Sequence, residues 1–208
     1  MFTHRRDLQF KATPDHPDAR CGRRLEEALA DQYGEITVAM HYMFHGWDMH
    51  VPGRYRDLVF ALGCEQVAHI EMLSAMVARL LDRAPIQMVD EATRANPAVA
   101  AMIGGTDLQD AIAAGAGPGA NRHHHNPWLN ADGTVDRNLL ADFRANVSAE
   151  RDRRYDLPRL GRLTDDPDVH FLLAHLRARA AVQQQACQIV VAQLAEHGLQ
   201  APHPRTSA

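Results

Sequence analysis

The sequence predicts an all-α protein, a bundle of four long helices with one long connection between the second and the third. Two observations support this fold class. Apolar residues recur every three or four positions over four long stretches of the chain. The second and third stretches are separated by roughly 50 residues rich in Gly, Asn and Pro, whereas most helix–helix loops have about 2–8 residues. No alternation typical of strands interrupts the helical pattern.

The first helix is expected over residues 23–50 and the second over residues 55–82. One side of the second helix is apolar apart from a single histidine, and its residues recur at helical spacing: Leu58, Leu62, His69, Met72, Met76 and Leu80. Pro52-Gly53 breaks the chain between the two helices. Residues 1–20 are expected to be extended because this segment contains prolines that would break a helix.

The third helix is expected over residues 136–163, with a kink at Pro158, and the fourth over residues 166–196. The stretch TDDPD favours a helix start, with Asp166 as the N-cap and Pro167 in the first turn. Four long helices with one long crossover connection are the plan of ferritin-like bundles. The sequence therefore predicts a ferritin-like four-helix bundle.

The crossover connection is expected over residues 84–135, with short helices near 97–102 and 108–113. It contains GGT, GAGPG and NRHHHNPW, which are typical of loops. A chain of this length suits one domain, which is expected to span residues 1–208.

Composition excludes several classes of function. The formal net charge of −4 offers no electrostatic basis for binding nucleic acid. No apolar run reaches the roughly 18 residues that span a bilayer, and the N-terminal segment lacks the apolar core of a secretory signal. The three cysteines, Cys21, Cys64 and Cys187, form no paired motif, so a disulfide framework is not expected. These features predict a protein of the reducing cytoplasm.

Each of the four helices places a polar residue near its middle, on or beside the apolar face. These residues are Glu35, His69, Glu150 and Gln183. Inward carboxylates and histidines from all four helices are the ligands of di-metal sites in such bundles. Taken singly, each residue has an ordinary interpretation as a hydrogen-bonded core or edge group, so the joint placement carries the metal hypothesis.

At these residues the sequence resembles the manganese catalase family. The resemblance is carried by almost the whole chain, in stretches such as MFTHRRDLQF, GEITVAMHYMFHGWDMH, CEQVAHIEM, IGGTDLQDAIAAGAG and LTDDPDVHFLLAHL. It implies a ferritin-like bundle, usually a hexamer. It also implies a dinuclear manganese centre that converts hydrogen peroxide into water and dioxygen.

The resemblance places the metal ligands position by position. Glu35, His69 and Glu150 match the family's ligands, and Glu35 and Glu150 would also serve catalysis. Two positions depart from the pattern. Gln66 stands where the bridging glutamate is expected, and Gln183 stands where the fourth-helix histidine is expected. The metal would be manganese, as one or two ions, although these donor types also suit iron, and a metal-free state remains open.

Other side chains are expected to contribute to this site. Tyr42 shares a face with the first-helix glutamate and is expected to hydrogen-bond a ligand carboxylate and to serve catalysis together with Glu35 and Glu150. Glu65, His41 and His45 are candidates to compensate for the lost ligands. In a metal-free core, Arg179 is expected to pair with a carboxylate such as that of the third helix.

The substitutions leave three interpretations open. In the first, the chain is a redox protein that acts on hydrogen peroxide or another small oxidant at an altered metal site. In the second, it is an oxidase or oxygenase of an organic substrate. In the third, it is a metal-free structural or assembly protein. All three are compatible with a homo-oligomer, and the first predicts that the double variant Q66E/Q183H gains manganese.

Overall fold

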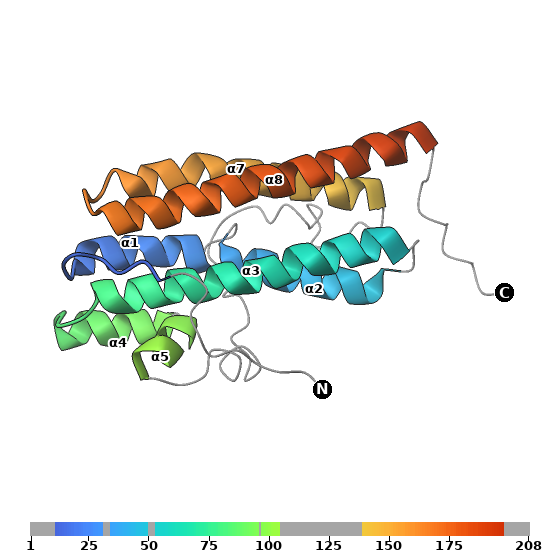
Figure 1. Ribbon diagram of the computed structural model, residues 1–208. Coiled ribbons are helices and arrows are strands. Elements are labelled where there is room, and N and C mark those ends of the chain that lie inside the picture. The colour runs from blue at the N-terminus through green and yellow to red at the C-terminus, as the bar shows by residue number, and fades with distance from the viewer. Residues whose placement is uncertain (1–10, 31–33, 50–52, 96, 105–138, 198–208) are drawn as a thin grey trace.

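The computed structural model describes residues 11–30, 34–49, 53–95, 97–104 and 139–197, and the regular structure in these ranges is helical throughout. The helices are α1 (Ala19–Ala30), α2 (Glu35–Asp48), α3 (Gly53–Leu80), α4 (Ile86–Ala95), α5 (Pro97–Gly104), α7 (Leu139–Gly161) and α8 (Pro167–His197). Figure 1 shows two layers: α7 lies against α8, and α1 and α2 follow one another along α3. The predicted all-α, ferritin-like bundle is confirmed.

The prediction of one continuous first helix is wrong. The helix expected over residues 23–50 is two helices, because α1 ends at Ala30 and α2 begins at Glu35. Gly34 is the N-cap of α2, with φ of −67° and ψ of 158°, and this extended backbone cannot continue a helix. The break places Glu35 in the first turn of α2.

The start of α8 confirms the predicted cap. The backbone N–H groups of Asp168 and Val169 both donate to Asp166 Oδ1 at 3.0 Å, and Pro167 is the first helical residue. Asp166 also accepts a hydrogen bond at 2.7 Å from the backbone N–H of Asp15, in the segment that precedes α1. This contact ties the N-terminal part of the described chain to the start of α8.

The crossover contains more helix than expected. Helix α5 confirms the helix expected near 97–102, but α4 was not expected. Its apolar side is narrow, and it packs against α1 and α5 at one end of the bundle. The helix expected over 108–113 and the rest of the crossover lie outside the described residues.

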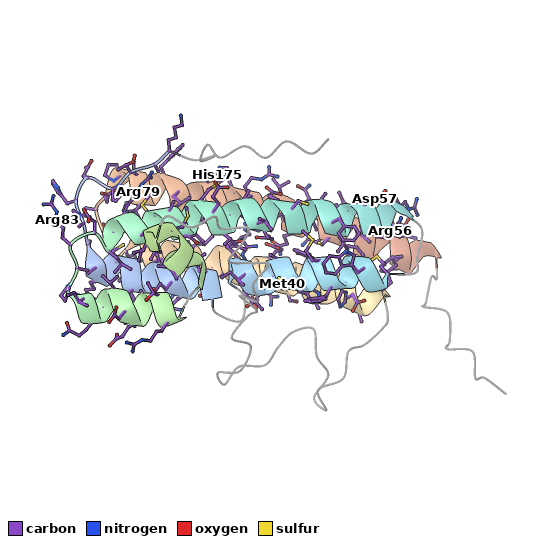
Figure 2. All side chains as sticks on the ribbon, turned by 90° about the horizontal axis from the view of Figure 1, so that it is seen from below. Met40, Arg56, Asp57, Arg79, Arg83 and His175 are labelled. Atoms are coloured by element: carbon purple, nitrogen blue, oxygen red, sulfur yellow. The ribbon has the colours of Figure 1, made fainter. Side chains whose placement is uncertain are left out.

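The core consists of two apolar clusters with buried polar side chains between them. One cluster includes Leu73 of α3 and Leu172 of α8, and the other includes Val59 of α3 and Leu194 of α8. Helix α3 is long and apolar enough to span a membrane by length and composition, but 56% of its apolar window is buried inside the bundle. Figure 2 shows Arg56 near one end of this helix and Arg79 near the other. The buried polar layer crosses the bundle between those ends.

Candidate functional site

The residues predicted at the five ligand positions meet in this polar layer. Each is at most 1% exposed: Glu35, Gln66, His69, Glu150 and Gln183. His69 Nδ1 lies 3.3 Å from Glu35 Oε2 and 3.2 Å from the Gln66 amide. The Gln66 amide is in turn 2.9 Å from the Gln183 amide. Four helices, α2, α3, α7 and α8, thus converge on one buried cluster.

A sixth member of the cluster, Arg153, was not predicted from the sequence. Its side chain is 5% exposed and lies one turn after Glu150 on α7. Nη1 donates to Glu150 Oε2 at 2.8 Å, and Nη2 donates to Glu35 Oε1 in a very close contact. One guanidinium therefore bridges two carboxylates that come from different helices.

Hydrogen-bond partners determine the orientation of the Gln66 amide. The amide oxygen accepts from Arg153 Nη1 at 2.9 Å, and the amide nitrogen donates to Glu35 and, at 3.2 Å, to His69 Nδ1. The opposite orientation would direct the amide nitrogen at the guanidinium and the amide oxygen at a carboxylate oxygen. Arg153 consequently contacts three of the five residues at the predicted ligand positions.

The two carboxylates experience different electrostatic environments. Although burial disfavours its charge, Arg153 and His69 hold the pKa of Glu35 below its ordinary value. Burial raises the pKa of Glu150, and the nearby charge of Glu35 adds to this effect while Arg153 opposes it. Burial also disfavours the guanidinium, but Glu150 and Glu35 raise the pKa of Arg153, so it remains charged.

Tyr42 makes the contact that the sequence predicted. The fully buried Tyr42 hydroxyl donates to Glu150 Oε1 at 2.9 Å. Burial and the carboxylate beside it raise the pKa of Tyr42 well above its ordinary value. The tyrosine therefore acts as a neutral hydrogen-bond donor to Glu150.

The candidate compensating carboxylate, Glu65, lies at the rim of the cluster. Its side chain is 23% exposed, and Oε1 is 3.8 Å from His69 Nε2. Oε1 also accepts a close hydrogen bond from Arg179 Nε. Arg179 therefore pairs with a carboxylate, as expected for a metal-free core, but the partner is Glu65 at the rim. The suggested partner, Glu150, is wrong because Arg153 already occupies the buried position beside it.

The other candidates, His41 and His45, have partners outside the five ligand positions. Their ring centroids are 4.0 Å apart, and His45 Nδ1 lies 3.7 Å from Asp142 Oδ2 of α7. Burial and the charge of His45 lower the pKa of His41 well below its ordinary value. Such a histidine is neutral at physiological pH.

This set of residues does not fit a dinuclear manganese centre. Among the described residues, no group of three or more His, Cys, Asp and Glu side chains is arranged to hold a metal ion. Two divalent ions beside Glu35 and Glu150 would leave two uncompensated positive charges, and the Arg153 guanidinium would add a third. Neutral amides such as those of Gln66 and Gln183 are poor substitutes for a bridging carboxylate and an imidazole nitrogen.

A cavity leads toward the cluster from the side formed by α1, the start of α2 and α7. Its volume is about 370 Å³, and its lining includes both Glu35 and Arg153. Arg20, Arg24 and Arg159 also line it, with Glu27 and Asp156 as carboxylate neighbours. Small solutes can therefore approach the guanidinium from this side.

Comparison with known proteins assigns the chain to a family. The family described as manganese containing catalase matches residues 1–207. The chain belongs to the manganese catalase family. It is 38% identical to a manganese catalase of Bacillus subtilis, over 88% of this chain and 67% of the relative. It is 41% identical to the uncharacterized protein YjqC of the same species, over 94% of this chain and 70% of the relative.

The fold agrees with a solved structure of the same family. The crystal structure of KatB, a manganese catalase from Anabaena, matches with a TM-score of 0.65 at 19% sequence identity. The match covers 100% of this chain and 86% of KatB. At this identity the structural likeness supports the fold alone.

Proposed function

We propose that this chain is a metal-free member of the manganese catalase family that has a structural or assembly role and does not convert peroxide. The 2.9 Å contact between the Gln66 and Gln183 amides carries this proposal. The family resemblance places a bridging carboxylate and a nitrogen ligand at these two positions. In this chain both are neutral amides, and their polar atoms approach to 2.9 Å. The Gln66 amide bonds to Arg153, Glu35 and His69 within the protein core rather than to an ion.

Metal content and oxygen release test the proposal directly. The protein, purified from cells supplied with manganese, is expected to contain far less than one manganese ion per chain. Loss of even supporting residues around a metal costs about 10–100-fold in affinity or activity, so loss of two ligands should lower oxygen release by more than about 100-fold. The comparison is the Bacillus subtilis manganese catalase, prepared and assayed in parallel with an oxygen electrode.

Each outcome of this experiment has a definite meaning. Stoichiometric manganese with oxygen release comparable to the Bacillus enzyme would show that the site still performs the family reaction. Bound manganese or iron without oxygen release would also contradict a metal-free core, and it would favour the interpretation as an oxidase. Absence of both, in protein that gives a cooperative thermal transition, supports the proposal.

Exposed apolar side chains on α8 support the assembly role. Val182 and Ile189 are 50% and 53% exposed and lie about two turns apart on one face. Apolar residues repeated along one helix face are typical of contacts between helices. We infer that a second copy of the chain covers this face, as expected for the homo-oligomer that the resemblance implies.

The substitution Val182→Glu is expected to reduce the mass of the protein in solution, measured by light scattering, toward that of a single chain. A buried, unpaired carboxylate in the middle of an apolar contact is strongly unfavourable. The control is Gln188→Glu, which adds the same charge to an exposed position on another face of α8. An unchanged mass for Val182→Glu, or equal dissociation of both variants, would show that this face is not the contact.

A further inference from the structure

We propose that the Arg153 guanidinium is an internal cation that performs the electrostatic work of a metal in this core. It holds together the carboxylates of α2 and α7. The inference rests on the metal-free core proposed above and adds the group that makes such a core stable. It concerns a residue that the family resemblance did not indicate.

The geometry places a positive charge where carboxylates and an amide converge. Arg153 Nη1 lies 2.8 Å from Glu150 Oε2 and 2.9 Å from the oxygen of the Gln66 amide. Nη2 donates to Glu35 Oε1. A planar guanidinium suits this arrangement because its fixed fork can donate to several acceptors at once. The bridge joins the first turn of α2 to the middle of α7 and contacts α3 through Gln66.

The charges of the cluster show why such a cation is needed. Two buried carboxylates without a cation would repel one another and would lose their hydration. Arg153 neutralises one of the two charges. Neutral hydrogen-bond donors stabilise the remaining negative charge: the Tyr42 hydroxyl donates to Glu150, and the Gln66 amide nitrogen donates to Glu35. Every charged group in the cluster thus has partners from at least two helices.

The same geometry works against a metal ion. Glu35 and Glu150 are the carboxylates at the predicted ligand positions, and both already bond to Arg153. A divalent ion would have to displace the guanidinium or share the carboxylates with it at close range, where like charges repel. Only 5% of the Arg153 side chain is exposed, so displacement requires its carbon chain to leave a packed position.

The cavity beside Arg153 allows a direct chemical test. In Arg153→Ala the carboxylates lose their cation, and the melting temperature is expected to fall by about 10 °C. Millimolar methylguanidinium, far below denaturing concentrations, should enter through the cavity of about 370 Å³ and restore part of this loss. The same concentration of sodium chloride should not, and neither solute should raise the melting temperature of the wild-type protein.

Two further variants complete the test. Arg151→Ala removes an exposed arginine from the same helix. Its side chain is 54% exposed and, within the described part of the chain, pairs only with the adjacent Asp152, so the melting temperature should not change. Arg153→Lys keeps the charge but not the forked guanidinium. Its melting temperature should therefore lie between those of Arg153→Ala and the wild type. If Arg153→Ala does not fold, the melting temperature of Arg153→Lys is measured instead.

Two results would overturn the inference: an Arg153→Ala protein as stable as the wild type, or a destabilised one on which methylguanidinium acts no better than sodium chloride. If Arg153→Ala fails to fold, an Arg153→Lys protein with the same melting temperature as the wild type would also overturn the inference. None of these measurements involves manganese, so they can fail while the proposed function stands. Conversely, manganese bound to the wild-type protein would contradict the proposed function whatever the rescue result.

Discussion

The double variant Q66E/Q183H is expected to bind little manganese, whereas the triple variant that also carries Arg153→Ala is expected to bind it with an affinity about 150- to 5,000-fold higher. The sequence alone suggested that restoring the two ligands would be sufficient. In the structure, the restored carboxylate at position 66 would lie beside Arg153, which already bonds to Glu35 and Glu150. Breaking a buried ion pair costs about 3–5 kcal/mol, which corresponds to this range of affinity.

The triple variant removes the competing charge as well as restoring the ligands. Glutamate at position 66 would provide a third carboxylate, and histidine at position 183 would provide a second imidazole beside the existing His69. Equilibrium dialysis against manganese, followed by elemental analysis, measures the affinity of each protein. A melting temperature that rises with manganese in the triple variant alone would show that the ion binds to the folded state.

A matched control separates loss of Arg153 from loss of any arginine. The variant Q66E/Q183H/R151A carries the same number of substitutions and should behave like the double variant, because Arg151 is exposed. If the double variant binds manganese as tightly as the triple variant, Arg153 is not a barrier to the ion. If neither binds, the ligand positions do not form a site even after restoration.

Most of the fold could be predicted because its pattern is local. Helical spacing of apolar residues marked the second, third and fourth helices, and the Asp166-Pro167 pair marked the start of α8. The break between α1 and α2 was missed because apolar spacing continues in phase from Leu29 to Ile36. The extended backbone of Gly34, immediately before α2, does not disturb that pattern.

The ligand positions could be predicted, but Arg153 could not. It stands in the run Arg151 to Arg154, where composition favours an exposed face. One turn after Glu150, both Arg153 and Arg154 satisfy the spacing of a helical ion pair. The rotation of α7 in the bundle decides between them: Arg153 turns into the core, and Arg154 donates to Gln184 Oε1 at 2.6 Å. That rotation depends on packing between helices, which periodicity within one helix does not determine.

The second large effect is expected from the carboxylates themselves. In E35Q/E150Q the guanidinium of Arg153 remains buried without a counter-ion, and the free energy of unfolding should fall by about 3–5 kcal/mol. In E35Q/E150Q/R153M all three charges are absent, and a methionine occupies the space of the arginine side chain. Replacing a whole buried ionic cluster by uncharged groups of similar volume is often neutral or stabilising, so this variant should recover most of the loss.

The coupling between the cation and the carboxylates can be isolated by a thermodynamic cycle. Its four members are the wild type, R153M, E35Q/E150Q and E35Q/E150Q/R153M, and urea unfolding measures the stability of each. A large coupling means that Arg153 is stabilising only because Glu35 and Glu150 are charged. Additive losses would instead mean that Arg153 acts by packing, and the view of it as an internal cation would then fail. If the core is metal-free, as proposed, the cycle also bears on why both carboxylates are present, because a strongly coupled Arg153 would favour keeping them. Their presence beside Gln66 and Gln183 would then reflect the ion pair and not a residual affinity for manganese.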